Sequence, residues 1–380
     1  MENSEHLRIV GTTDIIDSDQ PVSPLAKPWA SKTCRILVYI FEFFATFQIA
    51  HHYMEQTMWV KLPAYLAGQE RLPYQRRVLL MFILRPLHGL PALAKVANHF
   101  SEGQFTGDNL VLALINIICM GFTGWIATRF YRKASPDGQL AMLVYPVFLL
   151  CVMWTFTFNP TGTYPYDFPS LAFYTAGLYL IYANHYKWLL LVMLVGSINR
   201  ETTMFLIPVY LVTALFRDPL KRWTNLPWLK ISVLALIWAA VKLVLSRCFV
   251  HNDPSEAVIH FGLNLPLLSP VHWPEVLDAC GYLLPILWLL RKRIKDCTAA
   301  AGIYVFPLWF VVMMIYGFIM EVRIYGELCG YVATVSILLF DSYIQSRADP
   351  RANSRDRSAA IDPRPLKLKE ISRASRTFLY

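Results

Sequence analysis

The stretch "GSINRETTMFLIP", residues 196–208, places ionisable side chains between two apolar runs. A charged residue at the centre of a membrane helix costs roughly 2.5–3.5 kcal/mol on insertion scales, so it needs water or a polar partner. Ionisable residues inside a membrane are functional candidates by default. We therefore predict that Asn199, Arg200 and Glu201 belong to a functional site facing a wet, polar cavity. The alternative is a local ion pair that only stabilises the turn.

The composition indicates a membrane protein. Hydrophobic residues make up 56% of the 380-residue chain and charged residues only 16%, and the mean hydropathy is +0.40. Soluble domains contain about 25% charged residues. Because apolar runs recur along nearly the whole length, we predict a single all-α polytopic membrane protein.

We expect about eight full transmembrane helices and one short helical hairpin. A spanning helix needs about 20 residues. The expected spans cover residues 36–54, 108–131, 138–158, 167–184, 231–248, 276–290, 301–320 and 324–340. Two apolar pieces, residues 188–198 and 202–216, are shorter than a span. They form either a hairpin that dips into the bilayer and returns, or one broken pass.

The distribution of Lys and Arg favours the hairpin, because cytoplasmic loops of membrane proteins carry an excess of these residues. With the N-terminus inside, the inner loops hold Arg129, Arg132, Lys133, Lys187, Arg217, Lys221, Arg222, Lys230, Arg291, Lys292, Arg293 and Lys295. The outer loops 159–166 and 249–275 hold no Lys or Arg. This pattern requires residues 188–216 to begin and end on the inner side, with Arg200 at the outward-facing tip.

The chain divides into three parts under this topology. Residues 1–35 form a polar cytoplasmic segment, residues 36–340 a transmembrane domain with a long outer loop at 55–107, and residues 341–380 a basic, disordered cytoplasmic tail. Basic inner loops and a basic tail facing anionic lipids explain the net charge of +9. Membrane lipids, and no nucleic acid, are therefore the expected partners. Tight loops favour a bacterial inner (plasma) membrane with both termini in the cytoplasm.

The first outer loop breaks the charge rule. Its basic residues are Lys61, Arg71, Arg76, Arg77, Arg85 and Lys95. Arg binds phosphate through two parallel hydrogen bonds, so Arg71, Arg76 and Arg77 predict an anionic ligand at the outer membrane surface. The alternative is an amphipathic interfacial helix whose Arg side chains bind lipid headgroups.

Carboxylates gather on the same side of the predicted membrane. They are Glu55 after the first helix, Glu70 in the outer loop, Asp167 at the start of the fourth helix, and Glu321 and Glu327 beside Arg323 in "MEVRIYGELCG". Arg323 and Glu327 are four residues apart and are expected to pair on one helix face. Asp167, followed by Pro169, also suits a helix N-cap. The charges around Arg323 also suit a plain interfacial turn.

The histidines of the outer loops predict no metal site. His251, His260 and His272 lie there, but their separations match no known ligand pattern. We therefore expect solvated loop histidines. The sequence neither requires nor excludes a divalent cation.

Guanidinium and carboxylate groups at the outer bilayer surface suit a lipid-phosphate substrate. The phosphate would lie among Arg side chains, and the lipid tail would lie between helices. A carboxylate would deprotonate or orient an acceptor hydroxyl while the lipid phosphate leaves. This chemistry is glycosyl transfer from a polyprenyl-phosphate sugar.

The order of these features resembles that of the integral-membrane type-C glycosyltransferases, over roughly residues 36–340. Three segments carry the likeness: "LPYQRRVL" (72–79), "YPYDFPSLAFY" (164–174) and "NRETTMFLIP" (199–208). The resemblance implies eight or more spans, a long first outer loop with amphipathic helices, and a catalytic carboxylate early in that loop. That carboxylate is Glu55, nearer the helix end, or Glu70, beside Arg71. Some enzymes of this class use a divalent cation.

A lipid-linked sugar and polysaccharide-assembly proteins are the partners that this function implies. Two other functions remain open. A transporter or flippase for a lipid-linked or anionic solute is suggested by the broken helix, although no internal repeat is visible. A non-catalytic membrane subunit of a polysaccharide assembly system is the third possibility.

Overall fold

A computed structural model describes residues 32–101, 105–136, 138–158, 162–218, 220, 222–255 and 258–348. Its helices are α1 (Lys32–Glu55), α2 (Leu62–Ala67), α3 (Leu79–Leu84), α4 (Pro91–Ser101), α5 (Gly107–Ala134), α6 (Val144–Met153), α7 (Asp167–Tyr182), α8 (Tyr186–Asn199), α9 (Leu206–Arg217), α10 (Trp228–Cys248), α11 (Phe261–Asn264), α12 (Trp273–Val276), α13 (Leu283–Leu290), α14 (Cys297–Tyr316) and α15 (Cys329–Ala348). Three irregular turns shape the site: the π-turn η4 (Trp154–Phe158) and the 3-10 turns η5 (Glu201–Phe205) and η10 (Val322–Leu328). No strand occurs in these described ranges. The expected polar N-terminal segment and basic tail lie mostly outside them.

The chain divides into two compact units at Phe41. The first unit contributes the described residues 32–41, which begin helix α1. The second unit starts at Glu42 and holds every other described element. All contacts discussed below belong to this second unit.

The fold is that of a polytopic helical membrane protein. Within the described residues, six helical stretches are long and apolar enough to span a bilayer. They are Lys32–Glu55, Gly107–Ala134, Ala141–Phe158, Trp228–Cys248, Cys297–Tyr316 and Val322–Ser346. The other two expected spans correspond to α7, with 16 residues, and to α13, with eight. The count of eight spans therefore stays a prediction.

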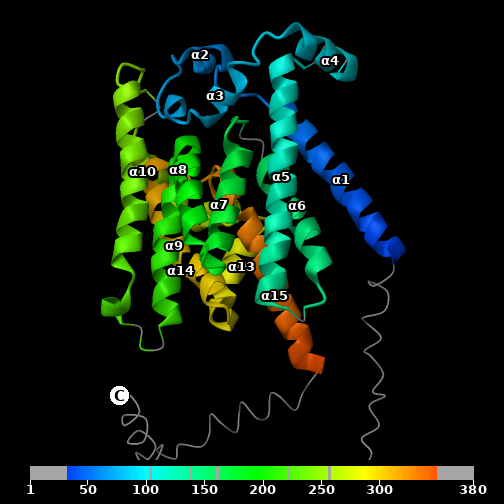
Figure 1. Cartoon of the computed structure of the whole chain (residues 1–380), viewed down its shortest axis with the longest axis vertical. Helices are drawn as coiled ribbons and strands as arrows, with labels where there is room; N and C mark the ends of the chain where they lie inside the picture. The colour runs from blue at the N-terminus through cyan, green and yellow to red at the C-terminus, as the bar shows by residue number, and fades with distance from the viewer. Residues whose placement is uncertain are drawn as a thin grey trace, which may run out of the picture. The chain divides into compact units, whose positions relative to one another are not determined.

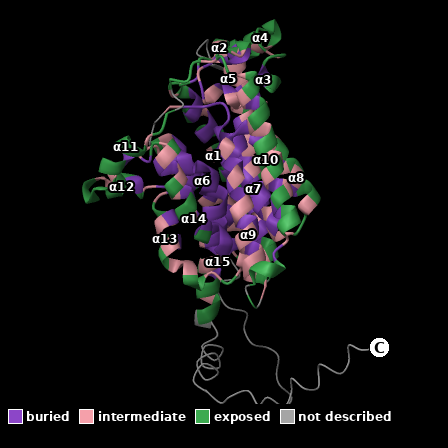
Figure 2. Ribbon diagram, turned by 90° about the vertical axis from the view of Figure 1, so that its left-hand side faces the viewer, coloured by how far each residue is buried: buried purple, intermediate pink, exposed green. Residues whose placement is uncertain are grey.

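Helix α7 forms the centre of the second unit. It packs against α5, α8, α9, α14, α15 and η10, and most of its side chains are buried. Helices α5, α7, α8, α9 and α10 run side by side (Figure 1). Buried residues concentrate between the helices and exposed ones lie on the outside, on α10 for example (Figure 2). Exposed Leu229, Leu236 and Leu243 on α10 give this helix an apolar outer face, as expected of a surface that meets lipid.

Helices α8 and α9 form the expected hairpin. Arg217, the last residue of α9, donates hydrogen bonds to the carbonyl oxygens of Ile181 at 3.3 Å and Tyr182 at 3.0 Å. Those carbonyls end α7, four residues before α8 begins at Tyr186. The start of α8 and the end of α9 therefore lie at the same end of the helices, and Arg200 lies between the two helices at the other end.

Candidate functional site

The turn between α8 and α9 begins at Arg200. Its backbone is extended, with φ −157° and ψ 149°, and its N–H still donates to the Gly196 carbonyl at 2.8 Å. The helix therefore stops at Arg200, and the 3-10 turn η5 follows. Asn199 steadies the turn by donating to the Tyr166 carbonyl at 3.1 Å and to the Ser170 hydroxyl at 2.8 Å. Both acceptors are at the start of α7, so Asn199 has a structural role in the site.

Asp167 is the centre of a buried ion-pair network. One carboxylate oxygen accepts from Arg200 Nη1 at 3.2 Å; the other accepts from the Tyr53 hydroxyl at 2.7 Å and lies 3.8 Å from Arg323 Nη1. Asp167 is only 1% exposed. Its position as the first residue of α7 favours an anion, because the helix dipole is positive there. The N-cap interpretation was wrong: Tyr166 is the N-cap residue, and the Asp167 carboxylate binds side chains of other elements.

Glu327 completes the network from η10. Its Oε1 lies 3.3 Å from Arg200 Nη1 and accepts a short hydrogen bond from the Thr202 hydroxyl. Arg323, on the same turn, pairs with Glu321 at 2.9 Å instead of with Glu327. The expected Arg323–Glu327 pair assumed an α-helix, whereas η10 is a 3-10 helix, in which residues three apart share a face. Arg323 and Glu327 consequently bind different partners.

Close packing fixes η10 in place. A Cβ atom on Gly326 would lie 2.2 Å from Phe156 Cζ, so only glycine fits beside the π-turn η4. Phe156 in turn makes an edge contact with Tyr53, the donor to Asp167, at a centroid distance of 5.8 Å. The Arg323 guanidinium lies 3.7 Å from the centroid of the Tyr164 ring. Aromatic packing therefore holds the network in place. The π-turn η4 also takes part in this packing, and π-turns occur frequently at functional sites.

A second group of charges surrounds Glu201. Arg77 Nε lies 3.0 Å from Glu201 Oε2, and Lys242 Nζ lies 3.6 Å from Glu201 Oε1. Two cations therefore pair with one carboxylate, and the positive charge of Arg76 acts on Lys242 from further away. Burial lowers the pKa of Arg77, but the Glu201 carboxylate and the Tyr166 side chain together outweigh that effect and leave the pKa above its usual value. This edge of the site therefore holds an excess of positive charge.

Water reaches the two groups differently. The Asp167 and Glu327 residues are 1% and 2% exposed, whereas the side chains of Glu201 and Glu321 are 32% and 31% exposed. The buried carboxylates act as fixed partners of guanidinium groups. The half-buried carboxylates at the edge are the ones that an incoming molecule can contact.

The structure brings together most of the residues that the sequence selected. Asp167, Arg200, Glu321, Arg323 and Glu327 form one network of ion pairs, and Arg77 and Glu201 form a second group. The guanidinium groups of Arg77 and Arg200 lie near the same Tyr166 ring, at 4.5 and 5.9 Å from its centroid, which joins the two groups. Sequence reasoning missed Tyr53, Thr202 and Lys242 as members of the site. It also missed Tyr164 and Tyr166, whose rings lie against the guanidinium groups of the site. Their place beside Asp167 in "YPYD" was a usable signal, because aromatic faces bind guanidinium groups.

The two predicted catalytic residues have other contacts. Glu70 is 3% exposed, and its carboxylate accepts from the backbone N–H groups of Lys61 at 2.8 Å and Arg71 at 3.1 Å. It therefore ties together the outer loop, while the Arg71 guanidinium lies 5.4 Å from the centroid of the Tyr74 ring. Glu55 is exposed and contacts neighbouring histidines of α1. The contacts described for Glu55 and Glu70 therefore lie within α1 and within the outer loop, whereas Arg71 and Arg77 lie over the same Tyr74 ring.

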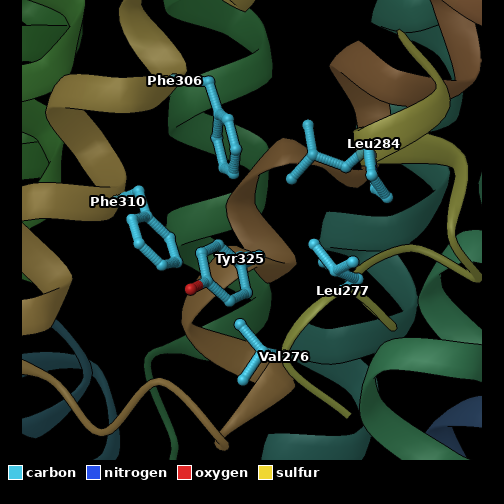
Figure 3. A pocket seen from close by; sticks show the side chains of 8 residues that line it. Val276, Leu277, Leu284, Phe306, Phe310 and Tyr325 are labelled. Carbon is cyan, nitrogen blue, oxygen red and sulfur yellow. The ribbon is translucent and has the colours of Figure 1, made fainter. Parts of the chain in front are cut away.

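An apolar cavity of about 220 Å³ lies beside η10 (Figure 3). The rings of Phe306, Phe310 and Tyr325 and the aliphatic side chains of Val276, Leu277 and Leu284 line it. Tyr325 lies on η10 between Arg323 and Glu327. The same short helix therefore contributes to the ion-pair network and to an apolar cavity.

No family model, curated protein or solved structure matches this chain.

Proposed function

We propose that this protein is a membrane glycosyltransferase that moves a sugar from a polyprenyl-phosphate donor to an acceptor at the outer face of a bacterial inner membrane. The observation that carries the proposal is the meeting of guanidinium, ammonium and carboxylate groups from five segments at one end of apolar helices. The eight-span, type-C-like architecture is part of this proposal.

The donor phosphate binds at the edge of the site in this scheme. Arg77 and Lys242 outnumber the single Glu201 carboxylate there, and Arg76 adds positive charge near Lys242. A phosphate group supplies the missing negative charge and accepts from the planar guanidinium groups. The buried network offers no such excess, because Arg200 and Arg323 already bind carboxylates.

Glu201 and Glu321 are the carboxylates best placed to act on an acceptor hydroxyl. About a third of each side chain is exposed, at 32% and 31%, so a substrate can approach within hydrogen-bonding distance. The catalytic role of Glu55 or Glu70 stays a prediction that rests on the resemblance. Glu70 is the poorer candidate, because backbone N–H groups already occupy its oxygens.

The apolar cavity beside η10 suits part of the donor's hydrocarbon chain. Its volume of about 220 Å³ is below the roughly 300–1,000 Å³ of pockets that enclose whole small molecules. It therefore accommodates a segment of a long chain, while the remainder lies in the bilayer. The lining of the cavity is almost entirely apolar, which suits an apolar group.

The positions of basic residues support the outer side for the site. Arg217 and Lys230 lie at the other end of the helices, far from Arg200. There Arg217 donates to the Tyr182 carbonyl at 3.0 Å, and the Tyr186 hydroxyl donates to the Lys230 carbonyl at 2.8 Å. Arg129, Arg132 and Lys133 also lie toward the end of α5 remote from Thr106. That end is the cytoplasmic one under the positive-inside rule.

Binding of a 55-carbon polyprenyl monophosphate to the full chain in nanodiscs tests the proposal. We expect saturable binding that weakens at least tenfold in Arg77→Met and Lys242→Met, and no binding of the neutral polyprenol. Arg129→Met, which removes a cation from the other end of α5, is the matched control and should bind normally. Equal binding by the wild type and both edge variants would overturn the phosphate site.

Transport is the second candidate, favoured by the interruption of the hairpin at Arg200 and η5. Proteoliposomes loaded with a fluorescent polyprenyl-phosphate sugar separate the two functions. Movement of the lipid between leaflets without a glycosylated product would favour transport. Release of polyprenyl phosphate with sugar on an added acceptor would favour the transferase.

A further inference from the structure

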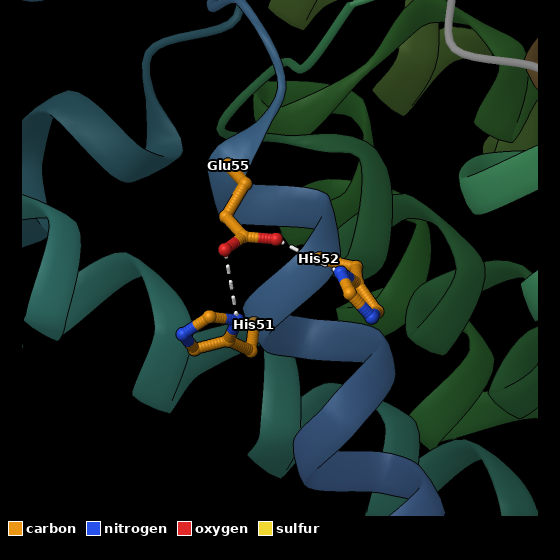
Figure 4. A group of neighbouring side chains, drawn as sticks. All are labelled: His51, His52 and Glu55. Carbon is orange, nitrogen blue, oxygen red and sulfur yellow. Dashed lines mark hydrogen bonds and ion pairs between the residues drawn. The ribbon is translucent and has the colours of Figure 1, made fainter.

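Two adjacent histidines and a glutamate share the last turn of α1. The carboxylate of Glu55 lies between the rings of His51 and His52 and contacts both (Figure 4). Their ligand atoms all lie within 4.8 Å of one another. In the part of the chain that the structure describes, no other three His, Cys, Asp or Glu side chains meet this condition.

The separations suit a metal ion. Glu55 Oε1 lies 3.5 Å from His51 Nδ1, and Glu55 Oε2 lies 2.8 Å from His52 Nδ1. Ligands bound to tetrahedral zinc at about 2.0–2.1 Å are roughly 3.3 Å apart, so small side-chain rotations complete the geometry. Two imidazoles and one carboxylate form a ligand set known from zinc sites that keep a position open for water.

The surroundings of the three ligands favour a cation. They lie in the last turn of α1, where free carbonyl groups give the helix its negative end. Gln48 lies one turn earlier, and its Nε2 is 2.7 Å from His52 Nε2. If the metal takes Nδ1, His52 carries its proton on Nε2, and rotation of the Gln48 amide presents an oxygen to accept it. Metal-bound histidines commonly have such a partner.

We propose that His51, His52 and Glu55 bind a divalent transition-metal ion of the zinc type, with water completing its coordination. Imidazole ligands favour such ions over magnesium or calcium. The site is distinct from the ion-pair network, and Glu55 acts in it as a ligand. Tyr53, on the same turn, donates to Asp167, so this turn of α1 also reaches the ion-pair network.

Titration of the full chain with Co²⁺ tests the site directly. The protein is purified in detergent without a polyhistidine tag and freed of metal with a chelator. We expect the visible absorption of a low-symmetry cobalt site at one ion per chain, and its loss when one equivalent of Zn²⁺ is added. His51→Ala, His52→Ala and Glu55→Gln should each weaken Co²⁺ binding at least tenfold, and Gln48→Ala should weaken it less.

The chain offers a matched control. His272 and Glu275 form a two-residue pair at 3.5 Å with the same spacing as His52 and Glu55, but without a second histidine. His272→Ala should leave the Co²⁺ titration unchanged. Thermal unfolding checks that each variant is folded. An equal loss of binding in His272→Ala, or wild-type binding in His51→Ala/His52→Ala, would overturn the proposal.

Discussion

The charges around Asp167 and those around Glu201 differ in their access to water. Asp167 and Glu327 are almost fully buried, and both are satisfied by fixed partners. Glu201 is 32% exposed and has more cations than carboxylates near it. A buried ion pair is strongly destabilised when one partner is removed, whereas an exposed pair contributes about 0–1 kcal/mol. The inner group should therefore govern stability, and the outer group should govern binding.

Loss of Arg200 should have the largest effect on stability. Arg200→Met leaves the buried Asp167 and Glu327 carboxylates without their shared guanidinium, which should lower the free energy of unfolding by about 3–5 kcal/mol. Denaturant unfolding of the purified chain measures this change. Lys187→Met, an exposed change at the start of α8, should stay within about 0.5 kcal/mol. Similar stabilities for the two variants would show that the inner group is not a stabilising network.

Removal of the Tyr53 hydroxyl tests one hydrogen bond of the network. Tyr53→Phe takes away the 2.7 Å donor to buried Asp167 and should lower the free energy of unfolding by about 1–3 kcal/mol. Tyr316→Phe is the control, because that side chain is 67% exposed. A Tyr53→Phe protein as stable as the control would show that the arginines alone stabilise the buried Asp167 carboxylate.

The packing of η10 on η4 should tolerate no added methyl group. Gly326→Ala puts a Cβ atom 2.2 Å from Phe156 Cζ and should lower the free energy of unfolding by about 1–3 kcal/mol. Phe156→Leu in the same chain should restore part of the loss. Gly262→Ala, where nothing lies within 4 Å of the added atom, is the matched control. If both glycine variants unfold alike, η10 is not held by this contact.

Neutralising Glu201 should change binding more than stability. Glu201→Gln keeps the shape of the side chain but leaves Arg77 and Lys242, whose side chains are each 14% exposed, without their counter-ion, so the free energy of unfolding should fall by about 1–2 kcal/mol. Removing the competing negative charge should raise the affinity for polyprenyl monophosphate, while sugar transfer should slow if this carboxylate acts on the acceptor. Binding in nanodiscs and turnover are measured on the same sample. Weaker phosphate binding would argue against an anion site at this edge.

Periodicity and charge distribution were sufficient to predict most helices and the hairpin. The expected pieces 188–198 and 202–216 correspond to α8 and α9. An apolar segment in a membrane must be helical to satisfy its backbone, and the charges of "NRET" interrupt the apolar run. The expected span 276–290 was less successful, since only its second half, Leu283–Leu290, is the helix α13, and residues 277–282 are not helical. Apolar character alone does not distinguish one long helix from two short ones.

The site was predictable in its members and less so in its pairings. Charged residues in apolar surroundings must find partners, so Arg200 and Asp167 were recognisable from the sequence. Which partner each one takes depends on backbone geometry. Arg323 was expected to pair with Glu327, but the 3-10 geometry of η10 turns them to different partners. Lys242 carried the same signal, because it is a charged residue in the outer half of the apolar span 231–248, but its partner was not predictable. Tyr53 carried no signal of its own, because its role comes from helices that are distant in the sequence.

The sequence by itself determined a helical membrane protein with costly charges at the tip of a hairpin, because the energetics of hydrocarbon leave few places for Arg200 and Glu201. Only the tertiary structure decided that Arg200 binds Asp167 and Glu327 while Glu201 binds Arg77 and Lys242. The physical reason is that the cost of burying a charge depends on the residue and its sequence neighbours, which the sequence shows. The partners that offset this cost come from packing between segments far apart in the chain, which only the tertiary structure shows.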